Sequence, residues 1–104
     1  MTKTYLVVYG KSKGSNFSGY APDVPGCISV GDTLDEMSAM LREALEMHIE
    51  LTTGDGEPIP EPITTNVEFK PEDFEDVEYF VVQHLDVHVP DAKQTASTEA
   101  HQAA

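Results

Sequence analysis

The sequence predicts an α+β domain in which an antiparallel sheet carries one long helix. Two observations indicate this class. Segments rich in β-branched and aromatic residues, bounded by turn residues, lie near both ends of the chain. Between them, a single stretch from Thr33 to Gly54 shows the apolar spacing of an amphipathic helix. Strands followed by one helix and a returning strand form two layers around one core.

Three strands are expected before the helix. Thr4–Tyr9 (TYLVVY) predicts the first, and the turn residues that follow it, through Asn16, predict a hairpin loop. Phe17–Ala21 predicts the second strand, which ends where Pro22 removes a backbone donor. After a loop with two prolines, Cys27–Val30 predicts a short third strand.

The helix has the clearest start signal in the chain. Thr33 is expected to cap it, because Glu36 three residues later completes a capping box. Gly54 is expected to end it. Apolar spacing predicts that the following side chains pack on the sheet: Leu34, Met37, Met40, Leu41, Ala44, Leu45, His48 and Leu51. A mostly acidic face is expected to be solvated: Asp35, Arg42, Glu43, Glu46 and Glu50.

The rest of the chain contains one further clear strand. Asp55–Pro62 (DGEPIPEP) holds three prolines in eight residues and predicts an extended connector. Thr64–Phe69 is expected to add an edge strand, and Pro71–Asp76 a helical turn. Tyr79–Val89 alternates in polarity and predicts the fourth strand. We expect one domain over residues 1–90 and a disordered tail over 91–104, where apolar periodicity is absent.

The charge balance restricts the possible partners. The chain has 6 Lys and Arg against 19 Asp and Glu, a formal net charge of −13. Nucleic acids are bound through Lys and Arg, so direct nucleic-acid binding by this chain is not expected. A basic protein is favoured as partner, because complementary potentials accelerate encounter. Solubility alone would account for the acidity equally well.

Cys27 is the single cysteine, so an intramolecular disulfide is impossible. We interpret it as a small buried hydrophobe. The chain has no apolar leader at Met1–Lys3 and no run approaching the ~20 apolar residues of a membrane helix, so cytoplasmic residence without membrane contact is expected. A small sheet with a narrow stability margin is expected to form a homodimer or a dimer-based higher oligomer.

The histidines allow more than one interpretation. His84, Asp86 and His88 project from one face of the last strand at steps of about 7 Å, which makes convergence on one metal ion awkward. A metal site stays open, but the polar, solvated face of an antiparallel strand is favoured. His48 is interpreted as a core or interface histidine on the helix stripe. No cofactor and no metal are therefore predicted.

An acidic run supplies the candidate partner-binding site. It places five carboxylates and two apolar side chains in seven residues: Glu72, Asp73, Phe74, Glu75, Asp76, Val77 and Glu78. Most charge runs are only solvated surface. Apolar anchors among the acids are, however, what a docking segment for a cationic groove needs.

Three stretches together resemble the HicB antitoxin family and its short relatives: YAPDVPGCISVGDTLDEM (20–37), EALEMHIE (43–50) and DGEPIPEP (55–62). The Pro-Asp-x-Pro-Gly-Cys loop is the most specific part. The resemblance implies a partial ribonuclease-H-like fold with three antiparallel strands, one helix and a returning fourth strand. It also implies an antitoxin whose partner is a small basic ribonuclease toxin of the HicA type, neutralised by masking of its active site.

Two features limit what the resemblance implies. Longer family members carry a C-terminal DNA-binding domain, whereas this chain is expected to end in its tail, so DNA binding is not carried over. Complete ribonuclease-H enzymes also need a first-strand carboxylate for metal, and Tyr5–Tyr9 has none. A binding module without enzymatic activity is therefore predicted. The alternatives are a stand-alone oligomer of the same fold with another ligand, and a metal-dependent hydrolase using His84, Asp86 and His88.

Overall fold

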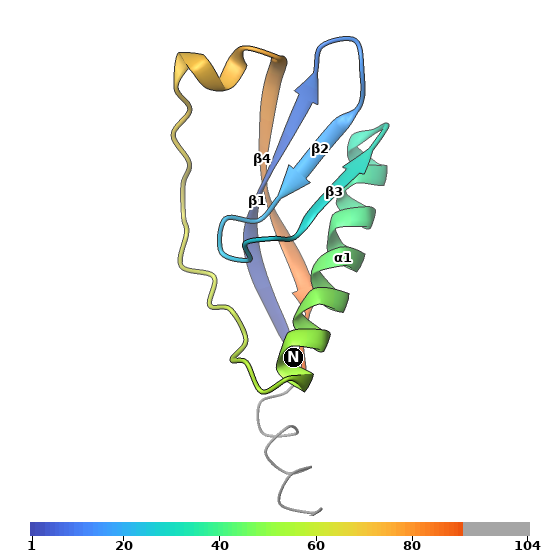
Figure 1. The fold of residues 1–104 in the computed structure, drawn as a ribbon, viewed down its shortest axis with the longest axis vertical. Coiled ribbons are helices and arrows are strands. Elements are labelled where there is room, and N and C mark those ends of the chain that lie inside the picture. The colour runs from blue at the N-terminus through green and yellow to red at the C-terminus, as the bar shows by residue number, and fades with distance from the viewer. Residues whose placement is uncertain (91–104) are drawn as a thin grey trace, which may run out of the picture.

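The structure is a computed structural model that describes residues 1–90; the predicted tail, 91–104, lies outside the described residues. Its elements follow the order β1 (Thr2–Ser12), β2 (Phe17–Tyr20), β3 (Ile28–Gly31), α1 (Leu34–Gly54), η1 (Pro71–Phe74) and β4 (Val77–His88), where η1 is a short 3₁₀ helix (Figure 1). The predicted α+β class, the strands near the chain ends and the single long helix are confirmed.

The four strands form one sheet in the order β3-β2-β1-β4, and every neighbouring pair is antiparallel. The predicted return of the last strand is confirmed, because β4 pairs with β1 from Thr2 to Ser12. β2 is shorter and pairs with β1 only from Val8 to Lys11. Within residues 1–90, the first half of β1 therefore has no strand on its β2 side. The ribonuclease-H-like relation stays a prediction of the resemblance.

α1 covers one face of the sheet and makes the main core. Its N-cap is the predicted one: Thr33 Oγ1 accepts a hydrogen bond from the Glu36 N–H at 3.1 Å. The Glu36 carboxylate reaches back to the N–H of Asp32, at 3.3 Å, rather than to that of Thr33. The core joins α1 to side chains of β1 and β4: Tyr5, Val7, Tyr9, Met37, Leu41, Leu45, Ile49, Leu85 and Val87.

The predicted helix stripe is partly wrong. Leu34, Met40 and Leu51 are exposed, and the buried side chains of α1 follow steps of four residues: Met37, Leu41, Leu45, Ile49 and Thr53. Each such step turns the buried line by about 40° around the helix axis. The line winds because α1 crosses the strands, starting beside β3 and ending beside β4.

The long connector, residues 55–70, starts on the α1 side, where Ile59 packs on the core beside Tyr5, and reaches the opposite face of the sheet by Phe69, which stacks on Phe80 (Figure 1). Leu6 and Val8 of β1 point to that face and are buried there. The predicted edge strand at Thr64–Phe69 is wrong, since this segment pairs with no strand. It packs over the face of the sheet, where its backbone cannot join a ladder at the edge. The predicted extended connector and helical turn are confirmed, the turn as η1.

The close approach of α1 to β3 gives a stability test at Gly31. A Cβ on this residue would lie 2.8 Å from the backbone nitrogen of Met37, and backbone cannot yield as a side chain does. Gly31→Ala should therefore lower the free energy of unfolding by about 1–3 kcal/mol in urea titrations. Gly54→Ala, whose Cβ meets nothing within 4 Å, is the control and should not destabilise. Equal stabilities of the two variants would contradict the described packing.

Candidate partner-binding site

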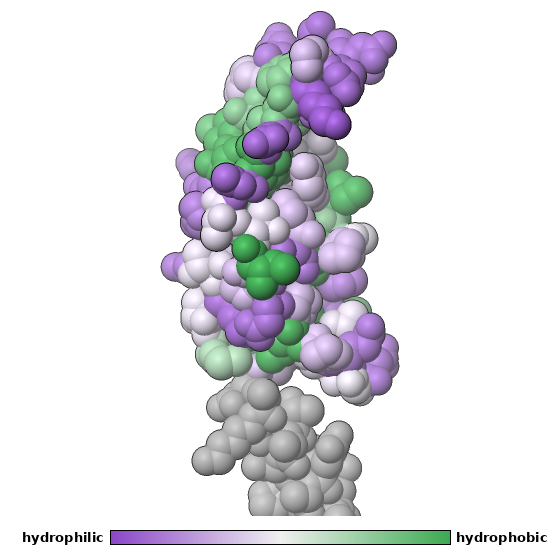
Figure 2. All heavy atoms as spheres, turned by 90° about the vertical axis from the view of Figure 1, so that its left-hand side faces the viewer, coloured by the Kyte–Doolittle hydropathy of each residue, from purple (hydrophilic) through white to green (hydrophobic). Residues whose placement is uncertain are grey.

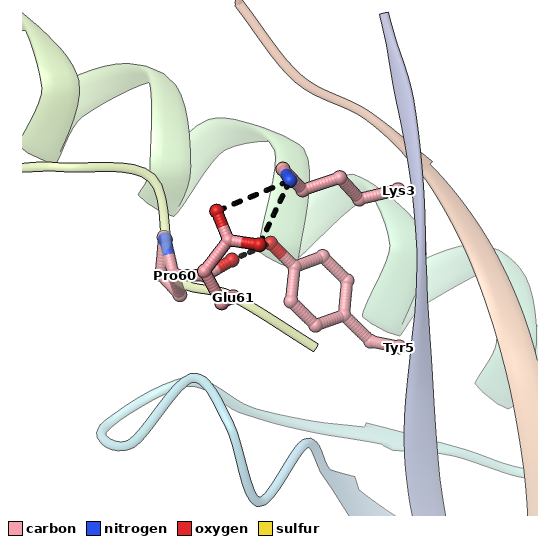
Figure 3. Close-up of polar contacts among 4 residues, drawn as sticks. All are labelled: Lys3, Tyr5, Pro60 and Glu61. Atoms are coloured by element: carbon pink, nitrogen blue, oxygen red, sulfur yellow. Dashed lines mark hydrogen bonds and ion pairs between the residues drawn. The ribbon is translucent and has the colours of Figure 1, made fainter. Parts of the chain in front are cut away.

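The connector is held at its start by side chains of β1 (Figure 3). The Tyr5 hydroxyl donates a hydrogen bond to the Pro60 carbonyl at 2.6 Å. The Lys3 ammonium group donates to both carboxylate oxygens of Glu61, at 3.2 and 3.3 Å. These contacts occupy the part of β1 that has no β2 neighbour, so they take the place of strand pairing there.

The Asp23 carboxylate fixes the route of the connector beyond Glu61. This carboxylate, in the loop after β2, accepts from the N–H and the hydroxyl of Thr64, at 2.9 and 2.6 Å.

Burial, followed by the nearby Glu61 and Asp23 carboxylates, raises the pKa of Tyr5 to about 12. The Tyr5 hydroxyl therefore stays protonated and donates to Pro60 at any physiological pH.

Three aromatic rings anchor the end of the connector to β4. The ring of Phe69 stacks on Phe80 with centroids 4.2 Å apart, and Phe74 of η1 meets Phe80 edge-on at 5.0 Å. Figure 2 faces this side of the sheet and shows apolar side chains gathered toward its upper end, with polar groups around them. Aromatic pairs of this kind add about 0.5–1.5 kcal/mol each beyond their area burial. The aromatic cluster therefore positions η1.

The acidic run, Glu72–Glu78, follows directly from that anchor. It extends from η1 through a bend into the start of β4, and its carboxylate residues are all exposed. The Asp73 carboxylate accepts from the Lys70 N–H at 2.8 Å, and Glu78 lies 4.0 Å from the Lys11 ammonium group. Within residues 1–90, the other three carboxylates form no ion pair: Glu72, Glu75 and Asp76.

The two apolar residues of the run, Phe74 and Val77, are partly covered by the domain itself and are not fully exposed to a partner. Phe74 is 39% exposed, and its ring already contacts Phe69 and Phe80. Val77 is half-buried. Lys13, in the β1–β2 loop, bonds the backbone carbonyls of Glu75 and Asp76. The run is therefore held by its backbone and its aromatic ring, while its free carboxylates face solvent.

The three candidate metal-ligating residues are not brought together. His84, Asp86 and His88 are exposed on the connector side of β4, as the solvated-face interpretation predicts. The Asp86 carboxylate accepts a 2.6 Å hydrogen bond from the Thr4 hydroxyl. In the described part of the chain, no three His, Cys, Asp or Glu side chains form a group able to hold a metal ion.

Two residues assigned to the solvated face of the helix have a different role. Arg42 Nε donates to the backbone carbonyl of Asp86 at 3.0 Å, and the Glu46 carboxylate accepts from the His88 N–H at 2.9 Å. Both side chains thus reach around to β4. Arg42 is exposed, as expected of the solvated face, and Glu46 is half-buried; both make bonds to β4 that the sequence does not predict, because α1 crosses toward the end of β4.

Two further candidate residues, Cys27 and His48, remain. Cys27 is buried, as predicted, and burial raises the pKa of its thiol. His48 is half-buried at the surface end of the core and borders two hollows of about 230 and 260 Å³. Both hollows are smaller than typical ligand pockets of roughly 300–1,000 Å³. Among residues 1–90, no helix has the length and apolar character needed to cross a membrane.

The fold and surface define a class of protein: a small acidic α+β domain with one helix on a four-stranded antiparallel sheet. The family model described as the HicB-like antitoxin of bacterial toxin-antitoxin systems matches residues 5–98. The chain therefore belongs to the HicB-like antitoxin family.

Solved structures agree with this membership. A chain of the HicA3 and HicB3 toxin-antitoxin complex is 26% identical, with a TM-score of 0.54 over 86% of this chain and 100% of that one. The crystal structure of antitoxin HicB3 shares the fold, with a TM-score of 0.62 and 20% identity over 97% of this chain and 83% of that one.

A curated relative matches a shorter stretch. An uncharacterized 14.9 kDa protein of Haemophilus phage HP1 is 51% identical over 39 residues, which are 38% of this chain and 29% of the phage protein. The match thus spans less than a third of that relative's length.

The anchoring of the connector gives a pH-dependent test at Tyr5. Tyr5→Phe should lower the free energy of unfolding at neutral pH by about 1–3 kcal/mol, because the Pro60 carbonyl loses its donor. The raised pKa of Tyr5 favours the folded state fully below pH 10, and this contribution is lost as pH rises from 10 to about 12. Urea titrations should therefore show a smaller difference between wild type and Tyr5→Phe at the alkaline end. Tyr20→Phe, at an exposed position, is the control; a Tyr5 variant as stable as this control at neutral pH would disprove the anchoring.

Proposed function

We propose that this chain is an antitoxin that neutralises a small basic ribonuclease toxin of the HicA type by covering its active site. The observation that carries the proposal is the exposed acidic run, fixed in place and holding three carboxylates that form no ion pair within residues 1–90. Family membership and the similarity to a chain of the HicA3 and HicB3 complex support it.

Electrostatics supply the mechanism. A ribonuclease binds RNA through cationic side chains that neutralise phosphates. Glu72, Glu75 and Asp76 offer carboxylates that compete for the same cations, and the net charge of −13 draws a basic protein toward this surface. Because the run is held by its backbone, little ordering is needed on binding, which favours affinity.

We also propose that the chain itself catalyses nothing. β1 (TKTYLVVYGKS) contains no carboxylate, so a metal mechanism of the ribonuclease-H kind lacks its first-strand ligand. Within residues 1–90, no three His, Cys, Asp or Glu side chains form a group able to hold a metal ion, so the hydrolase alternative at His84, Asp86 and His88 is not favoured.

The acidic run is tested by removing its free charges. In the triple variant Glu72→Gln, Glu75→Gln and Asp76→Asn, the free energy of unfolding should change little, because exposed charges contribute only ~0–1 kcal/mol per pair. Association with the basic protein encoded beside this chain's gene should slow by roughly tenfold at low salt and become less salt-dependent. Stopped-flow or surface-plasmon measurements over a salt series give both quantities.

The matched control removes three charges elsewhere, on the outer side of α1: Asp35→Asn, Glu43→Gln and Glu50→Gln. This control loses the same net charge as the run variant, but its association rate should stay within about twofold of that of the wild type. If the control slows association and the run variant does not, the contact surface lies on α1. The absence of a small basic reading frame beside the gene would favour the stand-alone alternative.

The homodimer predicted from the sequence has a candidate interface on α1. The outer side of α1 carries an apolar stripe of Met40, Ala44, Met47 and Leu51, with the spacing 4-3-4 of a helix-pairing seam. Met40, Met47 and Leu51 are exposed, as is Ile28 of the neighbouring β3. We propose that this stripe pairs with its copy in a second chain. The stripe would serve the stand-alone alternative as well.

Sedimentation equilibrium tests the dimer. Wild type should sediment as a dimer at high micromolar concentration, and Met47→Gln with Leu51→Gln should shift it to monomer without loss of helix content by circular dichroism. Leu34→Gln, an exposed leucine outside the stripe, should leave the dimer intact. A monomeric wild type would end the proposal of self-association.

A further inference from the structure

Within residues 1–90, β4 is one of the two edge strands of the sheet, the other being β3, and the backbone orientation of β4 can be read from two contacts. The His88 N–H donates to Glu46, and the Asp86 carbonyl accepts from Arg42, so both residues turn their backbone groups away from β1. The Val89 N–H, in contrast, donates to the carbonyl of Met1, the residue just before β1. Backbone direction alternates along an antiparallel strand. Even-numbered residues of β4 therefore present their N–H and C=O groups outward.

The register keeps this alternation along the strand. β4 pairs with β1 without a shift from Phe80 to His88, and the one irregularity lies at Lys11/Ser12, beyond Phe80. Phe80, Val82 and His84 consequently point their N–H and C=O groups outward too. In the part of the chain that the structure describes, β1 is the only strand that pairs with β4.

The two halves of this edge differ. Near its end, Arg42 and Glu46 of α1 bond to the outward groups of Asp86 and His88. At Phe80, Val82 and His84 no described residue makes such a bond. Proteins commonly shorten, cover or charge free strand edges, because an open edge pairs readily with another chain. The open half of β4, a strand of 12 residues, can therefore pair with a strand of another chain.

The chemistry around the open half indicates the occupant. The acidic run leads directly into it, Glu78 being part of β4, and Val82 beside it is 44% exposed next to the aromatic cluster. A second copy fits poorly, because antiparallel pairing of two β4 strands about Val82 would set Glu78 of one opposite Asp86 of the other. Like charges opposite each other destabilise a strand pair. A strand with cationic and apolar side chains is complementary.

We propose that a strand of the basic partner protein adds to the open edge of β4 and forms main-chain hydrogen bonds with Phe80, Val82 and His84. This inference rests on the proposed function and specifies how the partner docks. The free carboxylates of the run attract the partner, and the ladder bonds set its register. The bonds of Arg42 and Glu46 end the available edge at Asp86.

Amide hydrogen exchange measured by NMR tests the docking without changing the sequence. In the free chain, the amides of Phe80, Val82 and His84 should exchange fast, while those of Val81, Gln83 and Leu85, which face β1, should be slow. With the basic protein encoded beside the gene in excess, exchange at the first three should slow by at least about tenfold. Exchange at the other three should remain slow.

The other outcomes separate the possible failures. Binding without protection of the three outward amides would overturn strand addition and leave the proposed function standing. The lack of any binding, or of such a neighbouring protein, would overturn both. Outward amides already protected in the free chain would mean that another segment holds the edge: a second copy if protection rises with concentration, and residues 91–104 if it does not.

A pair of variants at Val82 gives an independent measurement. Val82→Pro removes one outward N–H without breaking a bond to β1, and proline is tolerated at strand edges. The dissociation constant for the basic partner should rise about tenfold or more, the cost of one lost ladder bond in a docked strand. Val82→Thr keeps the N–H and the branched side chain and should bind within about threefold of wild type. Equal loss in both variants would show that the side chain, not the backbone, makes the contact.

Discussion

The structure depends on the burial of β1 on both faces. From Tyr5 to Gly10 each residue of this strand is buried, and its side chains alternate between α1 and the connector. A strand in this position needs cover on two sides, which the helix alone cannot give. The connector supplies the second cover where Phe69 stacks on Phe80, and the segment that leads there is held by the Tyr5 hydroxyl, which donates to Pro60, and by the Asp23 carboxylate, which accepts from Thr64.

The position of the acidic run follows from that requirement. Because the connector must lie over β1, it delivers η1 to the end of the sheet opposite the close of α1, and the run turns there into β4 (Figure 1). The same crossing of α1 that brings Arg42 and Glu46 to one half of β4 leaves the other half without backbone partners among residues 1–90. The acidic run and the open half of the β4 edge are therefore neighbours, because both positions follow from the way in which β1 is buried.

Local signals explain which parts of the fold were predictable. Thr33 and Glu36 mark the helix start by a bond within four residues, so sequence alone locates it. The unbroken apolar run of β1 already signals burial on both faces, and it is the clue that a cover for the second face exists. Ile49 is a core residue that the apolar spacing of the sequence does not predict, because the winding of the buried line depends on the angle between α1 and the sheet. The roles of Arg42 and Glu46 depend on the same angle, which no local pattern encodes. The acidic run was visible in the sequence, but which of its carboxylates are free depends on Lys11 and on the Lys70 backbone.

The proposed function, silencing of a basic ribonuclease by direct contact, is tested most directly by an RNA cleavage titration. The small basic protein encoded beside the gene is purified alone, and its cleavage of RNA is measured against increasing amounts of this chain. The account predicts that cleavage stops at an equimolar ratio and returns when salt or the triple variant of the acidic run weakens the complex. Cleavage that continues in a complex shown to be intact by gel filtration would contradict active-site masking.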